Sequence, residues 1–196
     1  MQEFELLSLS HFLGFSICLA LIVFIPKAIQ SKPGLEDFSK YLLVILLIEN
    51  QIRSTYIETW IKGGNLLENL PLHLCDFSAI VIAAFLLTGF RPLFIFAYFW
   101  GIAGAGMSIL TPDSEFAFPH YEYFATMYGH SLILLAVVFS IVNLGQRPYL
   151  RDIPKLILYS SILLVIMYGI NFILGANYWY LNESCLLYTS PSPRDS

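Results

Sequence analysis

The chain has 196 residues, of which 57% are hydrophobic and 12% are charged, and its formal net charge is −4. A soluble domain carries about a quarter charged residues, so this composition excludes an ordinary soluble protein and predicts a polytopic helical membrane protein. Three cysteines do not form a disulfide framework. The chain also lacks a basic patch and a glycine-rich phosphate loop, so we expect no nucleic-acid partner.

Six apolar segments predict six membrane-spanning helices in one all-α bundle over residues 1–183. The predicted spans are about His11–Ala28, Phe38–Trp60, Leu72–Thr88, Pro92–Leu110, Tyr121–Leu144 and Lys155–Ala176. Each is near the ~20 residues that cross about 30 Å of hydrocarbon. The acidic N-terminus lacks the basic region of a cleaved signal peptide, so we expect the first helix to stay in the mature protein.

The basic residues predict the orientation of these spans. They gather at the first, third and fifth connections, with a single lysine on the opposite side before the last stretch of the chain. The first group is Lys27, Lys32, Lys40, Arg91, Arg147, Arg151 and Lys155, and the single lysine is Lys62. Because cytoplasmic loops hold the excess of Lys and Arg, we expect a cell-membrane protein whose N-terminus lies outside.

The stretch Leu70–Asp76 places three chemically versatile side chains at the outer end of the third span: His73, Cys75 and Asp76. Ionisable groups at membrane depth raise a functional hypothesis. His73 and Asp76 are three residues apart, so on a helix they share a face and can hydrogen-bond. Cys75 faces away from His73. A base for a nucleophilic Cys75 must therefore come from another helix, and the alternative is that Cys75 packs as a small buried hydrophobe.

The best candidate for that base is His130, which lies in the fifth span within the segment Tyr128–Ser131. An adjacent imidazole can remove the proton of a thiol, although such a histidine can also simply hydrogen-bond a neighbouring helix. Gly129 beside it suits the close approach of a helix or an acyl chain. His120 lies at the membrane interface, where we expect it to anchor the helix or contact a lipid headgroup.

Span two carries Glu49 and Arg53, four residues apart. This spacing places opposite charges side by side on a helix, so we predict an internal ion pair. In the functional alternative, Arg53 also binds a lipid phosphate, whose geometry its planar guanidinium matches.

Most of these polar groups converge on the outer leaflet, together with the connection that holds Asp113, Glu115 and Glu122. His73, Cys75, Asp76, His120 and His130 are all metal-ligand types. They show no tight spacing such as C-x-x-C or H-E-x-x-H, however, so a metal site is only a weak third possibility. We expect neither a metal nor a cofactor.

The last stretch differs in composition from the rest of the chain. Ser184–Ser196 is rich in serine and proline and is similar to the translation of a sequencing adapter. We expect the native protein to continue differently after about Glu183, and we interpret the stretch, with Cys185, as a non-native or disordered tail.

Three segments give the chain a family resemblance: Leu70–Asp76, Phe118–Tyr121 and Tyr128–Ser131. They resemble the YwaF-like bacterial integral membrane proteins, which are related to a human transmembrane acyltransferase that remodels ether phospholipids. The resemblance implies a cysteine acyl-acceptor at Cys75 and a histidine at His130. It also implies a further membrane segment after about Leu181, where this chain departs from the family.

This resemblance implies a cysteine-dependent lipid acyltransferase at the outer leaflet, with phospholipids or lyso-lipids as partners. His73 and Asp76 would orient the site. The alternative is a non-enzymatic transporter or lipid-binding bundle in which the same polar cluster lines a cavity. The absence of inverted repeats in the sequence counts mildly against a transporter. Nothing in the sequence indicates the oligomeric state.

Overall fold

The structure is a computed structural model that describes residues 4–6, 8–32, 34–112, 114 and 116–182. Its regular elements are all helical, which confirms the predicted all-α fold. Three predictions fall outside the described residues. They concern Asp113, Glu115 and the tail Ser184–Ser196.

Each predicted span corresponds to a helix. The long helices are α1 (Leu9–Gln30), α2 (Leu35–Tyr56), α3 (Leu74–Thr88), α4 (Arg91–Trp100), α6 (Tyr121–Val142) and α7 (Ile153–Leu174). A π-helical turn, η1 (Ile57–Ile61), continues α2, and a second one, η3 (Gly101–Ala105), joins α4 to α5 (Gly106–Leu110). Short 3₁₀ turns complete the described part: η2 (Leu66–Glu68), η4 (Leu150–Asp152) and η5 (Tyr178–Tyr180).

In the described part of the chain, four helical stretches are long and apolar enough to cross a membrane: Leu9–Gln30, Arg91–Leu110, Tyr121–Val142 and Leu150–Leu174. The protein is therefore a multi-pass membrane protein. Helix α3 is apolar but has only 15 residues, which span about 22 Å at 1.5 Å per residue. Helix α2 carries charged side chains in its second half. That α2 and α3 also cross the bilayer stays a prediction.

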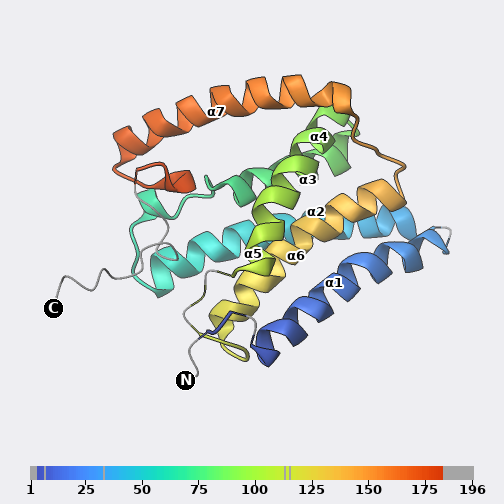
Figure 1. Cartoon of the computed structure of the whole chain (residues 1–196), viewed down its shortest axis with the longest axis horizontal. Helices are drawn as coiled ribbons and strands as arrows, with labels where there is room; N and C mark the ends of the chain where they lie inside the picture. The colour runs from blue at the N-terminus through green and yellow to red at the C-terminus, as the bar shows by residue number, and fades with distance from the viewer. Residues whose placement is uncertain (1–3, 7, 33, 113, 115, 183–196) are drawn as a thin grey trace.

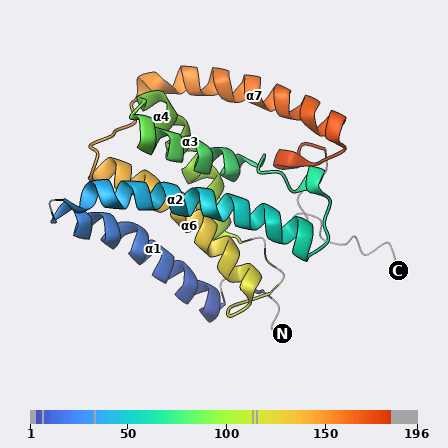
Figure 2. The same cartoon turned by 180° about the vertical axis from the view of Figure 1, so that it is seen from behind.

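Helix α3 lies at the centre of the bundle, and α1 and α7 lie at opposite margins (Figures 1 and 2). α3 packs against α2, α4 and α6. The core at these contacts contains Ile82, Phe85, Phe94 and Phe139, each at most 2% exposed. The beginning of α3, where the candidate residues lie, is therefore held by several helices.

Glycine permits one of the close helix contacts. A Cβ added to Gly101 would lie 3.2 Å from a methyl carbon of Ile133 on α6, and one added to Gly104 would lie 3.8 Å from Leu74. Nothing lies within 4 Å of the same position on Gly106. Close helix packing is thus found at Gly101, while Gly104 makes an ordinary contact and Gly106 makes none.

The chain after α7 folds back onto the segment that precedes α3. The Tyr178 hydroxyl donates to the carbonyl of Leu67 at 2.7 Å and accepts from the amide of Leu70 at 3.0 Å. The Trp179 indole N–H donates to the carbonyl of Leu72 at 2.8 Å. These bonds satisfy polar backbone groups of η2 and of the irregular residues between η2 and α3. The approach to α3 is thereby tied to the end of α7.

Candidate functional site

The first turn of α3 holds both Cys75 and Asp76. His73 has an extended backbone and is the N-cap, so the helix begins at Leu74 and not at the predicted Leu72. The Asp76 carboxylate accepts a hydrogen bond from the backbone N–H of His73 at 2.8 Å. The first amides of a helix have no intrahelical partner and give its N-terminus a partial positive charge. The backbone amides of Cys75 and Asp76 also interact with the thiol.

Asp76 connects three helices. One carboxylate oxygen accepts from the His73 amide, and the other accepts from the side-chain amide of Gln51 on α2 at 2.8 Å. The carboxylate also interacts electrostatically with His130 on α6. The contact with Gln51 was not predicted, because its partners are 25 residues apart and on different helices. Asp76 thus links the cysteine-bearing turn of α3 to the histidine of α6.

The orientation of the His130 imidazole is set by its own helix. Its Nδ1 lies 2.7 Å from the carbonyl oxygen of Thr126, one turn earlier on α6. A carbonyl oxygen only accepts hydrogen bonds, so Nδ1 must carry the proton in this contact. In the neutral ring Nε2 then holds the lone pair. Among the described residues Nε2 makes no hydrogen bond, so it is free to take a proton.

Cys75 is a free, half-buried cysteine that packs against the main hydrophobic core. Its helix, α3, is in contact with α6, which carries His130. Within the described part of the chain the thiol and the imidazole are not hydrogen-bonded to each other. Cys18 is also free but packs in the separate apolar cluster that includes Ile22, as expected for a structural cysteine.

Gly129 lets α2 approach the residue next to His130. A Cβ on Gly129 would lie 2.8 Å from the side-chain nitrogen of Asn50 on α2. The oxygen of the same amide accepts from Arg53 at 2.6 Å. The close approach of a helix that the sequence predicted at Gly129 is therefore present, and it brings the polar part of α2 against α6.

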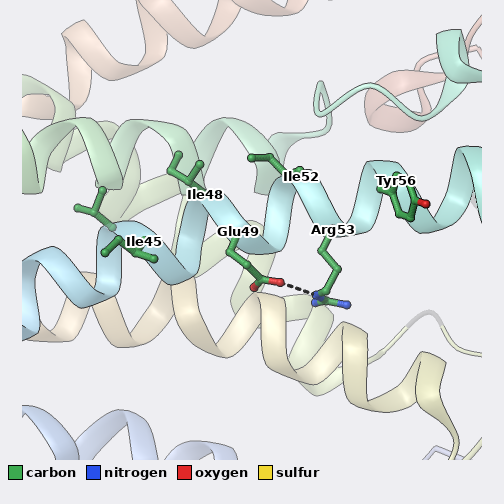
Figure 3. A pocket seen from close by; sticks show the side chains of 7 residues that line it. Ile45, Ile48, Glu49, Ile52, Arg53 and Tyr56 are labelled. Atoms are coloured by element: carbon green, nitrogen blue, oxygen red, sulfur yellow. Dashed lines mark ion pairs between the residues drawn. The ribbon is translucent and has the colours of Figure 1, made fainter.

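Each nitrogen of the Arg53 guanidinium group binds another side chain of the protein. Nε pairs with Glu49 at 3.2 Å, as the four-residue spacing predicted, and Figure 3 shows this ion pair. Nη2 binds Asn50, Nη1 donates to the Tyr121 hydroxyl at 2.6 Å, and the guanidinium lies over the Tyr128 ring. The pair borders a groove of about 650 Å³ on the exposed face of α2. This geometry favours pairing over the lipid-phosphate alternative.

His73 and His120 are both N-cap residues, a role that was not predicted for either of them. The His73 ring lies against Tyr178 and Tyr180, with centroids 5.1 and 5.6 Å away, and its hydrogen bond to Asp76 comes from the backbone N–H. His120 caps α6 and accepts from the amide of Glu122 at 3.3 Å. Helix capping explains both positions, because the residue just before an acidic first turn typically takes an extended backbone.

The described residues contain no group of three or more His, Cys, Asp or Glu side chains that could hold a metal ion. The polar residues near the start of α3 are instead a carboxylate held by two hydrogen bonds, a free thiol and an imidazole bonded to its own helix. Such a set can transfer protons and form a covalent bond through sulfur.

Comparison with known proteins adds the family. The sequence model of the TMEM164 family matches residues 3–193, a range that includes both Cys75 and His130. The chain belongs to the TMEM164 family. An uncharacterized protein of Treponema pallidum (strain Nichols) is 27% identical to this TMEM164-family protein over 165 residues, which cover 84% of this chain and 68% of the relative. No solved structure matches significantly. This membership is consistent with the related family that the sequence segments indicated, and the narrower YwaF-like grouping stays a prediction.

Proposed function

We propose that this TMEM164-family protein is a cysteine-dependent lipid acyltransferase that acts at the outer leaflet of the cell membrane. The observation that supports it most is the Thr126–His130 contact, which leaves Nε2 of the imidazole available as a base. The thiol of Cys75 lies on the neighbouring helix, in the first turn of α3, which is in contact with α6. The YwaF-like resemblance of the segments around both residues supports the same assignment.

In the first step Nε2 of His130 takes the proton of the Cys75 thiol, and the sulfur attacks the ester carbonyl of a phospholipid. The new C–S bond forms as the C–O bond of the ester breaks. The leaving lyso-lipid oxygen takes the proton back from His130, which leaves an acyl-thioester on Cys75. Hydrogen bonds at active sites often shorten only in the reacting complex, so we expect substrate binding to bring the thiol and imidazole together.

The second step regenerates the enzyme. A lyso-lipid hydroxyl gives its proton to Nε2 of His130 and attacks the thioester carbonyl. The C–S bond breaks as the new C–O ester bond forms, and the proton on His130 passes to the sulfur. Asp76 supports both steps as a positioning residue, because its charge stabilises the imidazolium that forms twice per cycle. Glu49 and Arg53 hold α2 and α6 together beside the site.

The test is acyl transfer from a labelled phospholipid to a lyso-lipid by purified protein. Cys75→Ala and His130→Ala should each abolish transfer, and the double variant should be no worse, because residues that act as a unit are non-additive. Cys75→Ser should fold but lose most activity. Cys18→Ala is the matched control and should stay active. A fully active Cys75→Ala protein would refute the covalent mechanism and leave the lipid-binding or transport function.

The orientation is a separate proposal based on the basic residues. In a background without native cysteines, a cysteine that replaces Asn65 should react with a membrane-impermeant thiol reagent added outside the cell. A cysteine that replaces Lys32 should react only after the membrane has been permeabilised. The reverse pattern would place the start of α3 on the cytoplasmic side and overturn the outer-leaflet assignment.

A further inference from the structure

A second cavity, of about 640 Å³, lies where α3 begins and α7 ends. This volume falls within the range of about 300–1,000 Å³ that is usual for small-molecule sites. The proposed acyl transfer uses none of its polar side chains apart from the neighbouring His73. The polar lining consists mainly of Glu68, Asn69 and His73 on one side and of Asn171, Asn177 and Asn182 on the other.

Hydrogen bonds hold much of this lining in place. Asn171 is buried and binds the backbone of Tyr178 through both atoms of its amide, each at 2.8 Å. Asn182 donates to the carbonyl of Ala176 at 3.1 Å. Glu68 accepts from Asn65 at 3.0 Å. By contrast, the side-chain amide of Asn69 makes no hydrogen bond to any described residue. The cavity therefore has a fixed wall and an amide that a ligand can bind.

The charge and hydrogen-bond character of the lining decide the class of ligand. Among the described residues, no lysine or arginine lines the cavity, and Glu68 is acidic, so a phosphate group is disfavoured against this part of the chain. Amide groups offer donors and acceptors together. A hydroxyl also donates and accepts, so it can bind both the oxygen and the N–H groups of an amide, whereas an ammonium group only donates and can bind the oxygen alone. The His73 ring already packs against Tyr178 and Tyr180, so it contributes less to an aromatic cage for an ammonium ion.

We infer that this cavity binds the uncharged, hydroxyl-rich headgroup of a glycolipid, such as a hexose linked to diacylglycerol. Because His73 lies two residues before Cys75, the cavity would be a subsite of the transferase. In this respect the inference rests on the proposed function. A sugar held here would place the glycerol backbone of the same lipid toward the first turn of α3. Asn69 is the specificity-determining residue, and the carboxylate oxygen of Glu68 accepts from a sugar hydroxyl.

The test is binding of glucosyl-diacylglycerol to the purified full chain in detergent, followed by native mass spectrometry. The comparison lipids are phosphatidylethanolamine and phosphatidylglycerol with the same acyl chains. The glucolipid should bind about tenfold more tightly than either. Asn69→Ala should weaken it about tenfold, as the loss of roughly 1.4 kcal/mol of hydrogen bonding implies. Glu68→Gln should stay within about twofold, because an amide oxygen still accepts from a hydroxyl.

Asn143→Ala is the matched control, since Asn143 follows α6 at the other end of the bundle. It should bind the glucolipid as the unchanged protein does. If phosphatidylethanolamine bound more tightly than the glucolipid, and Glu68→Gln removed that preference, the cavity would be an ammonium site. This result would overturn the inference. Equal binding of all three lipids would overturn it as well. The Cys75→Ala protein should keep the preference, so the result for the cavity is independent of the result for acyl transfer.

Discussion

The two ends of the bundle each hold an arginine in a network of hydrogen bonds, but the networks do different work. Arg53 joins α2 to α6 beside the carboxylate, thiol and imidazole of the candidate site. Arg91, at the other end, binds both oxygens of Asp152 at 3.1 and 2.7 Å and also donates to the carbonyl of Arg147. The second network fastens the loop before α7 to the start of α4.

The difference lies in what each network surrounds. The Arg91 pair joins a helix end to a loop and is partly buried, with Arg91 37% and Asp152 14% exposed. The network at the start of α3 includes Asp76, whose two oxygens are bound by groups from α2 and from its own N-cap. Asp76 also interacts with the imidazole of His130, whereas Asp152 is bound by Arg91 and by the backbone of Tyr149 at the other end of the bundle. Substitutions at the first end should therefore affect activity, and substitutions at the second should affect stability slightly.

The largest effect after loss of Cys75 or His130 themselves is expected for Asp76→Asn. The substitution removes the charge that interacts with His130 and alters the contact with Gln51. Acyl transfer should fall about 100-fold, since a small misplacement of a reacting group has an effect of that size. The rate is measured with a labelled lyso-lipid. Asp152→Asn, at the opposite end, should leave the rate unchanged. Equal rates for both variants would end the distinction between the two networks.

An intermediate effect is expected for Gly129→Ala. The added methyl group would lie 2.8 Å from the Asn50 amide, and overpacking of this kind destabilises a protein by about 1–3 kcal/mol. Thermal unfolding in detergent should show a lower Tm. Asn50→Ala should restore part of the loss in the double variant, because the two changes share one contact. Gly106→Ala, with nothing within 4 Å, is the control and should not lower the Tm.

The smallest effect is expected for Arg91→Lys. Lysine keeps the positive charge but cannot bind both oxygens of Asp152 in the same way. The variant keeps the charge and loses only part of the hydrogen bonding, at about 1 kcal/mol per bond, so the Tm should fall by a few degrees and acyl transfer should be unchanged. A large loss of transfer activity with a normal Tm would show that this end of the bundle takes part in the reaction.

Hydropathy and spacing were sufficient to predict the helices and the local pairs. The six apolar segments matched helices because helix length and apolar composition are properties of each segment alone. The Glu49–Arg53 pair followed from a separation of one helical turn. Gly129 was also informative, since the absence of a side chain permits a close contact whatever the neighbour is.

Long-range partners could not be predicted in the same way. Nothing local to Gln51 or Asp76 indicates that they meet, because the contact depends on how α2 packs against α3. The return of Tyr178 to the segment before α3 is equally non-local. The start of α3 had a usable signal that was missed. Asp76, three residues after His73, is a typical first-turn acid, and it favours an N-cap at His73.

The central claim, that Cys75 accepts the acyl group, is tested most directly by intact-mass measurement of the purified protein after brief incubation with a phospholipid and no acceptor. The account predicts a mass increase of one acyl group that maps to Cys75 and is removed by hydroxylamine, as a thioester is. Addition of a lyso-lipid should discharge it, and His130→Ala should prevent its formation. An unmodified Cys75 in protein that still transfers acyl groups, or an adduct that maps to Cys18, would contradict the account.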